Sequence, residues 1–174
     1  MTDPSIADGI ERPLDRRVIA LDRTIGMVVT ALLALPSFVF VVFVAAVGAS
    51  GGRALPVLAS LALLGGWAAA AVALGTFTYL WPAVVYRHAS YRVDAQGIEI
   101  RQGVYWRRIL NIPRSRVQHT DVSQGPVERK YGLGTLVIYT AGTDHARVAL
   151  SGLDYATAVR IRQHLLPGEA SDAV

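Results

Sequence analysis

Residues 24–52 (TIGMVVTALLALPSFVFVVFVAAVGASGG) contain no Asp, Glu, Lys or Arg, and neither do residues 54–86 (ALPVLASLALLGGWAAAAVALGTFTYLWPAVVY). Arg53 is the single charge between them. An α-helix rises about 1.5 Å per residue, so about 20 apolar residues cross the hydrocarbon core of a bilayer. A core helix of a soluble domain would need a polar stripe, which neither segment has. The sequence therefore predicts a transmembrane helical hairpin over residues 25–86, with spans at about 25–47 and 55–80.

Basic residues flank this hairpin on both sides and predict its orientation. They are Arg12, Arg16, Arg17 and Arg23 before the first span, and Arg87, His88 and Arg92 after the second. By the positive-inside rule, both termini are cytoplasmic in an integral plasma membrane protein with two spans. The cytoplasmic parts are then a tail of residues 1–24, a domain of residues 87–167 and a C-terminal tail of residues 168–174.

Two questions about the N-terminal part stay open. Val47-Gly48-Ala49 has the small residues of a signal-peptidase site, although the first span is longer than a usual signal core, which favours an uncut anchor. Residues 1–12 lack apolar periodicity and are expected to be disordered. Pro13–Arg23 forms either a short interfacial helix, with Leu14, Val18 and Leu21 on one side, or a solvated basic flank.

The composition limits the possible chemistry. The 174 residues include no cysteine, which excludes disulfides, zinc–thiolate sites and cysteine nucleophiles. The formal net charge is +4, and residues 87–167 hold twelve basic residues against six acidic ones. This balance suits a membrane surface, whereas no basic run is interleaved with aromatics in the way that nucleic-acid binding requires. We expect contact with the lipid bilayer and none with nucleic acid.

After the hairpin, the hydrophobic pattern changes to period two, which is typical of half-buried strands. Tyr91/Val93, Ile98/Ile100 and Val104/Trp106 alternate with polar residues. Asp94-Ala95-Gln96-Gly97 and Gln102-Gly103 are turn sequences between these strands. The third strand is predicted to reach Ile112, with a bulge at Arg107-Arg108. Further strands are predicted over residues 117–123, 135–140 and 146–150.

An amphipathic helix is predicted to follow these strands. Asp154 is placed as its N-cap, because a carboxylate can accept from the free amides of the first turn. The helix runs to about Leu166, where Pro167 stops it. Antiparallel strands closed by one helix make a small, partly open β-barrel or sandwich.

Four short motifs follow one another in this region. They are Ile112-Pro113-x-Ser115-Arg116-Val117-Gln118, Gln124-Gly125-Pro126-x-x-Arg129, Tyr131-Gly132-Leu133-Gly134 and Thr140-Ala141-Gly142. In this order, downstream of two spans, they resemble the bacterial pleckstrin-homology (PH) domains of the YdbS-like membrane-protein family. The resemblance covers roughly residues 25–166. It implies a membrane α-helical hairpin followed by a mainly-β PH-like roll of two near-orthogonal sheets, closed by the C-terminal α-helix.

The resemblance also implies roles for individual residues. The fold is a binding and scaffolding module, so catalysis and cofactors are not expected. The motif residues are expected to be structural: Pro113, Ser115, Gln118, Gly125, Pro126, Gly132, Gly134, Thr140 and Gly142. Among them, Gly125, Gly132 and Gly142 are expected in turns that need positive φ.

Six basic residues are the candidates for contact with anionic headgroups or an acidic partner: Arg107, Arg108, Arg114, Arg116, Arg129 and Lys130. The alternative is that they are solvated charges, with structural roles for Arg116 and Arg129 such as a pairing of Arg129 with Asp121. Phosphoinositide-binding PH domains generally carry basic residues around the first hairpin turn. Here that turn, Asp94–Gly97, has no cation at its tip, which argues against specific inositol-phosphate capture.

Enzyme chemistry finds no support in the sequence. The four histidines lack metal-ligand spacing, and Ser115, His119 and Asp121 have no evident oxyanion hole. No catalytic, cofactor-binding or metal-binding residue is predicted. The first function hypothesis is a non-enzymatic membrane-anchored adaptor or scaffold that binds a protein partner at the inner membrane face, with homo-oligomerisation left open. The alternative is a peripheral reader of anionic lipid headgroups that uses the arginine-rich surface.

Overall fold

A computed structural model describes residues 6–50, 54–141 and 147–166. The chain forms two units, Asp22–Pro82 and, together, Met1–Leu21 with Ala83–Val174. The expectations for the turn at Arg53, for Gly142 and for the tail of residues 168–174 fall outside the described residues.

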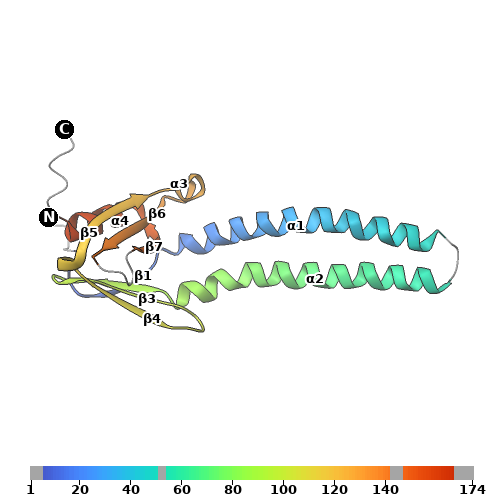
Figure 1. Cartoon of the computed structure of the whole chain (residues 1–174), viewed down its shortest axis with the longest axis horizontal. Coiled ribbons are helices and arrows are strands. Elements are labelled where there is room, and N and C mark those ends of the chain that lie inside the picture. Colours follow the sequence, from blue (N-terminus) through green and yellow to red (C-terminus); the bar gives the residue numbers. More distant parts are fainter. Residues whose placement is uncertain (1–5, 51–53, 142–146, 167–174) are drawn as a thin grey trace. The chain divides into compact units, whose positions relative to one another are not determined.

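Two long helices, α1 (Arg17–Ala49) and α2 (Ala54–Arg87), contain the predicted spans. Figure 1 shows them as an antiparallel pair. Within this pair, the hydroxyl oxygens of Thr30 and Thr78 are 3.3 Å apart, and the Ser60 hydroxyl donates to the carbonyl of Ala45 at 3.0 Å. Polar groups inside a bilayer need such partners because lipid supplies none. The long uncharged segments therefore pack as the predicted helical hairpin.

An arginine and a tyrosine mark one end of the hairpin. The Arg23 guanidinium lies 3.9 Å from the ring centroid of Tyr79, and its Nε donates to the Tyr79 carbonyl at 2.8 Å. A cation over an aromatic ring is a stable arrangement at the level of the headgroups. This pair lies where the start of the first span meets the end of the second.

The other unit contains two antiparallel sheets (Figure 1). The first has the order β1 (Glu11–Pro13), β2 (Ser90–Val93), β3 (Gly97–Gln102) and β4 (Arg108–Pro113). The second has the order β5 (Val117–Ser123), β6 (Leu133–Thr140) and β7 (Arg147–Asp154). A 3₁₀ turn, η1 (Arg114–Arg116), joins the sheets; α3 (Pro126–Tyr131) joins β5 to β6, and α4 (Tyr155–Leu165) follows β7.

One hydrophobic core joins both sheets to α4. Ile100 comes from the first sheet, Leu136 and Ile138 come from the second, and Ile161 and Leu165 come from α4; all are buried. The helix begins where predicted, since Asp154 is its N-cap and accepts from the Thr157 amide. The predicted PH-like roll closed by a C-terminal helix is confirmed.

The N-terminal segment belongs to this roll. Strand β1 pairs with β2 in the register Glu11↔Arg92, Arg12↔Tyr91 and Pro13↔Ser90. The expectation that residues 1–12 are disordered is therefore wrong for Glu11 and Arg12. A three-residue strand is too short to show periodicity, and it forms because the open edge of β2 offers unpaired backbone groups. Leu14 continues the attachment, because it packs against the hydrophobic core.

The third predicted strand begins later than expected. Val104 and Trp106 lie outside β4, which starts at Arg108, so their alternation with polar residues was misread as strand. Residues 103–107 instead form the loop between β3 and β4, and the chain turns at Gly103, where φ is 113°. The expected bulge at Arg107-Arg108 is the end of this turn.

Candidate functional site

The six candidate basic residues lie in three pairs on three elements. Arg107 and Arg108 stand at the junction of the β3–β4 loop with β4, Arg114 and Arg116 lie in η1, and Arg129 and Lys130 lie in the last turn of α3. Arg114 is half-buried and the other five are exposed. No hydrogen bond or ion pair between described residues joins one pair to another. The structure thus divides the expected surface into separate pairs.

Other arginines of the domain have carboxylate partners. Arg92 pairs with the buried Glu99 at 2.8 Å, and Arg101 bridges Glu99 at 2.5 Å and Glu11 at 2.8 Å. The hydrogen bond to Glu99 raises the pKa of Arg101. These arginines cross-link β1, β2 and β3, so carboxylates of the first sheet neutralise their charge.

The six candidate residues differ from Arg92 and Arg101, because none of the six forms an ion pair with a carboxylate of the described residues. In particular, Arg129 and Asp121 are both exposed and the expected pair between them is absent. Since no partner within the described chain neutralises them, these charges remain available for an external anion or acidic group.

Two of the three pairs lie beside residues that lead into the membrane helices. Arg107 and Arg108 line an open hollow of about 540 Å³ together with Tyr86, Arg87 and His88, where α2 ends. The start of α1 binds α3, because Arg17 Nη1 donates to the carbonyl of Tyr131 at 3.1 Å. Arg107/Arg108 and Arg129/Lys130 therefore flank the two chain connections to the spans.

The third pair lies at the far end of the strands. Strand β4 begins next to the β3–β4 loop and ends next to η1, so Arg114 and Arg116 are one strand length away from Arg107 and Arg108. Figure 1 shows β4 and β5 meeting at one end of the roll, with α3 at the other end of β5. A small hollow of about 100 Å³ at this end is lined by Arg116, by residues 110–113 of β4, by Thr140 and Ala141 at the end of β6, and by Val148 of β7.

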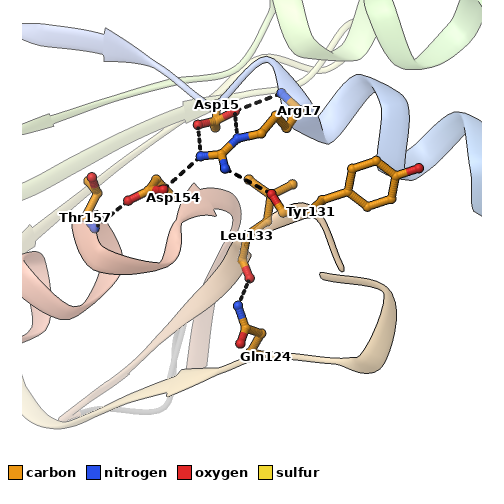
Figure 2. A network of polar contacts seen from close by, with 7 residues as sticks. All are labelled: Asp15, Arg17, Gln124, Tyr131, Leu133, Asp154 and Thr157. Carbon is orange, nitrogen blue, oxygen red and sulfur yellow. Dashed lines mark hydrogen bonds and ion pairs between the residues drawn. The ribbon is translucent and has the colours of Figure 1, made fainter. Parts of the chain in front are cut away.

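Figure 2 shows a polar network around Arg17 that the sequence did not predict. The guanidinium donates to both carboxylate oxygens of Asp15 at 2.9 and 2.7 Å and to Asp154 Oδ1 at 2.8 Å, in addition to Tyr131. The hydrogen bond from Arg17 holds the pKa of Asp15 below its usual value. Asp154 also caps α4 through the Thr157 amide. One side chain thus fixes the start of α1 to both α3 and α4.

The motif residues build the corner that presents α3. Gln124 donates to the Leu133 carbonyl at 2.6 Å, and Glu128 accepts from the Gly125 amide at 2.6 Å and from the Thr135 hydroxyl at 2.8 Å. Pro126 occupies the first turn of α3, where its missing amide costs nothing. These contacts support a structural role for this motif.

The glycines divide between two roles. Gly132 has φ of 67° and ends α3, as predicted, and a Cβ there would lie 2.9 Å from Arg17 Nη1. The prediction of positive φ is wrong for Gly125, which has φ of −70°. Gly125 is the N-cap of α3, so its position is set by the hydrogen bond to Glu128 and needs no left-handed backbone. At Gly134, a Cβ would meet the Tyr155 ring at 3.2 Å, so close packing explains this residue.

The remaining motif residues lie at the turn from β4 to β5. Pro113 ends β4, Ser115 lies in η1 and Gln118 lies in β5. Thr140 pairs with Val117 at the end of β6, and the Ala141 amide donates to the Arg116 carbonyl at 2.9 Å. The backbone of Arg116 is therefore fixed by the second sheet, while its side chain stays exposed.

Within the described residues, no group of three His, Asp or Glu side chains is arranged to hold a metal ion. Ser115, His119 and Asp121 are each exposed, and the His119 ring packs against Tyr139 at a centroid distance of 5.8 Å. The described surface therefore offers arginine charge and exposed aromatics as its main means of binding.

Two features of the site were missed by the sequence reading. Arg17 was counted only as a basic flank, because its partners Tyr131 and Asp154 are 114 and 137 positions away. Tyr105 and Trp106 were read as strand residues, although they are 80% and 85% exposed in the β3–β4 loop. The turn residue Gly103 was the available signal for that loop.

Known proteins with similar sequences agree with this architecture. A family model described as "Bacterial PH domain" matches residues 29–168. The "UPF0699 transmembrane protein YdbS" of Bacillus subtilis (strain 168) is 39% identical over 72 residues, which are 41% of this chain and 45% of that protein. The match thus spans less than half of that relative's length. No solved structure matches the chain. With a membrane hairpin, a PH-like roll and a family match over most of its length, this membrane protein belongs to the YdbS-like bacterial PH domain family.

Proposed function

We propose that the protein is a non-enzymatic adaptor, anchored by its two spans, whose PH domain binds an acidic protein partner through Arg114 and Arg116. The observation that carries this proposal is the separation of this pair from the other four basic residues. Arg116 is exposed, lacks a carboxylate partner among the described residues and lines the hollow at the end of β4. Arginine forks bind carboxylates in two parallel hydrogen bonds. The apolar part of the hollow, formed by Leu110, Ile112 and Val148, suits a neighbouring side chain of the same partner.

The proposal places both termini in the cytoplasm. Arg107, Arg108, Arg129 and Lys130 lie beside the connections to the helices, and positive charge next to a span favours the cytoplasmic side. A reporter that is active only in the cytoplasm should therefore work when fused after Val174. Activity only of a reporter that requires the external side would overturn the orientation and the partner location together.

Charge reversal with site-specific crosslinking tests partner binding. A photoreactive side chain at Ser115, which is exposed between the two arginines, should capture an acidic partner in intact cells. The double change Arg114→Glu and Arg116→Glu should abolish this capture. The matched control, Arg107→Glu and Arg108→Glu, changes the same amount of charge at the other end of β4 and should leave the capture intact. Equal capture in both double variants would contradict the proposal.

A second function, reading of anionic headgroups, is favoured by the two pairs that flank the helix connections. Each basic residue near an anionic leaflet adds about 1 kcal/mol of binding free energy. The binding free energy from the two pairs together is then several kcal/mol; they are Arg107 with Arg108, and Arg129 with Lys130. Because salt screens such contacts, hydrogen exchange of α3 and the β3–β4 loop in anionic nanodiscs should quicken when salt rises from about 0.1 to 1 M. The same exchange in purely zwitterionic discs should show no salt response. Identical exchange in both lipids at low salt would exclude headgroup reading.

A further inference from the structure

The loop between β3 and β4 carries large apolar side chains that the domain does not cover. Tyr105 is 80% exposed, Trp106 is 85% exposed, and Ile109, which follows at the start of β4, is 62% exposed. No other large apolar side chain of the described domain, outside the two long helices, is more exposed than these three. An exposed group of aromatic and aliphatic side chains on a folded domain usually marks a surface that meets another apolar phase.

The loop backbone turns tightly at Gly103. Gly103 has φ of 113°, and a Cβ at this position would lie 1.9 Å from the carbonyl oxygen of Trp106. The chain therefore folds back tightly on itself across the loop, with the backbone of Trp106 against Gly103.

The place of the loop in the fold indicates what it meets. Gly103, Arg107, Arg108 and Ile109 share the 540 Å³ hollow with Tyr86, Arg87 and His88, and the uncharged segment of the second span ends at Tyr86. The loop is thus next to the residues by which the chain leaves the bilayer. Tyrosine and tryptophan favour the interface between headgroups and hydrocarbon, because one part of the ring is apolar and the other is polar.

The neighbouring charges complement the same environment. Arg107 follows Trp106 directly, and neither it nor Arg108 pairs with a carboxylate of the described residues. An aromatic side chain at the acyl boundary with arginine beside it at the level of the phosphates is the composition of membrane-surface segments. A protein partner that bound Tyr105 and Trp106 would instead have to fit beside Tyr86 and Arg87, where α2 ends.

We propose that the β3–β4 loop is a third membrane contact, in which Tyr105 and Trp106 enter the interface of the leaflet from which α2 emerges. The occupant of this surface is the phospholipid bilayer itself. The contact is independent of the partner site at η1, and it depends on apolar burial, so it differs from charge-based headgroup reading.

The absence of cysteine in the chain makes a depth measurement straightforward. A nitroxide attached to Tyr105→Cys in the full chain, which retains Trp106, is reconstituted in vesicles of phosphatidylcholine and phosphatidylglycerol. We expect the nitroxide to collide more with oxygen than with a water-soluble nickel complex. The control Gln118→Cys, on the exposed face of β5 after η1, should show the opposite preference. Water-like collision at both positions would overturn the proposal.

A second measurement does not alter the loop. Trp67→Phe and Trp81→Phe leave Trp106 as the only tryptophan of the chain. Its fluorescence should be quenched by lipids brominated near the headgroup and protected from iodide in the water phase, also at high salt. Protection from iodide without quenching by brominated lipid would mean that a protein or a second copy of the chain covers the loop, and this would refute the membrane contact. Failure here leaves capture at Ser115 unaffected, so the two proposals can fail separately.

Discussion

Arg17→Met should loosen the corner where α3 and α4 meet the start of α1. Methionine keeps the length of the side chain and removes its donors. The variant loses the bonds to Asp15, Asp154 and the Tyr131 carbonyl (Figure 2). Two groups keep their backbone partners, because Asp15 still accepts from the amide of residue 17 and Asp154 from that of Thr157. The loss therefore comprises the local side-chain bonds to Asp15 and the two long-range bonds to Tyr131 and Asp154.

The expected cost follows from the exposure of these contacts. The Arg17 side chain is 48% exposed, so each of its ion pairs is screened by water and contributes about 0.2–1 kcal/mol. The hydrogen bond to the Tyr131 carbonyl adds about 0.5–1.5 kcal/mol. We expect a total of about 1–3.5 kcal/mol, which changes the local opening equilibrium by a factor of about 5–400.

Hydrogen exchange of the full chain in nanodiscs measures this local opening. The reporters are the Tyr155 amide, which donates to the Gly132 carbonyl, and the Gly132 amide, which donates to the Arg129 carbonyl. Their exchange should quicken by the expected factor, while amides of β3 should not change. Arg16→Met is the matched control, because Arg16 is exposed and its side chain has no hydrogen bond to a described residue. Equal exchange in the two variants would refute the role of Arg17.

Three further predictions concern stability. Gly103→Ala should open the β3–β4 loop, because the new Cβ would lie 1.9 Å from the Trp106 carbonyl oxygen. Electron paramagnetic resonance of a nitroxide on that loop should then show higher mobility than in the unchanged chain. Ile161→Ala, at a fully buried position of α4, should lower the free energy of unfolding of the roll by about 2–5 kcal/mol, measured by denaturant titration in detergent against the exposed control Gln163→Ala. The folded-state pKa of Asp15 lies below its ordinary value of 3.8, so its stabilising contribution is complete above that pH and is lost as the pH falls through the lowered pKa; a pH titration of Tyr155 amide exchange should therefore be flat near neutrality and rise only in acid.

The N-terminal attachment changes how the domain should be prepared. A soluble fragment that starts at residue 87 would lack β1, and with it the cross-link from Glu11 to Arg101 and the packing of Leu14 on the core. Such a fragment would expose the edge of β2 to solvent. Binding experiments on this protein therefore need the full chain.

The sequence by itself determined the membrane hairpin and much of the roll. A long segment without charge has no stable place in water, so composition alone predicts the spans. Strand alternation at Tyr91/Val93 and Ile98/Ile100, and the carboxylate of Asp154 before a helical pattern, are equally local signals. The turn at Asp94–Gly97 was predicted in the same way, whereas the register that places Arg92 opposite Glu99 came from the structure.

Only the tertiary structure decided which surface residues act together. Gly66 with Ala70, and Ala71 with Gly75, have the four-residue spacing of small residues that permits close helix contact. A Cβ at Gly66 or Gly75 would nevertheless meet nothing within 4 Å, whereas one at Gly26 would lie 2.5 Å from the Thr78 methyl group. Likewise, the sequence could not distinguish arginines that bind other parts of the chain from arginines that are free to bind an external group, because the neighbours that the fold supplies make this difference. Arg17 has partners at the ends of two distant helices. Arg107 and Arg116 lie near opposite ends of β4, and neither forms an ion pair with a carboxylate of the described residues. Long-range contacts leave no periodic trace in a chain, because periodicity reports only neighbours within the same helix or strand.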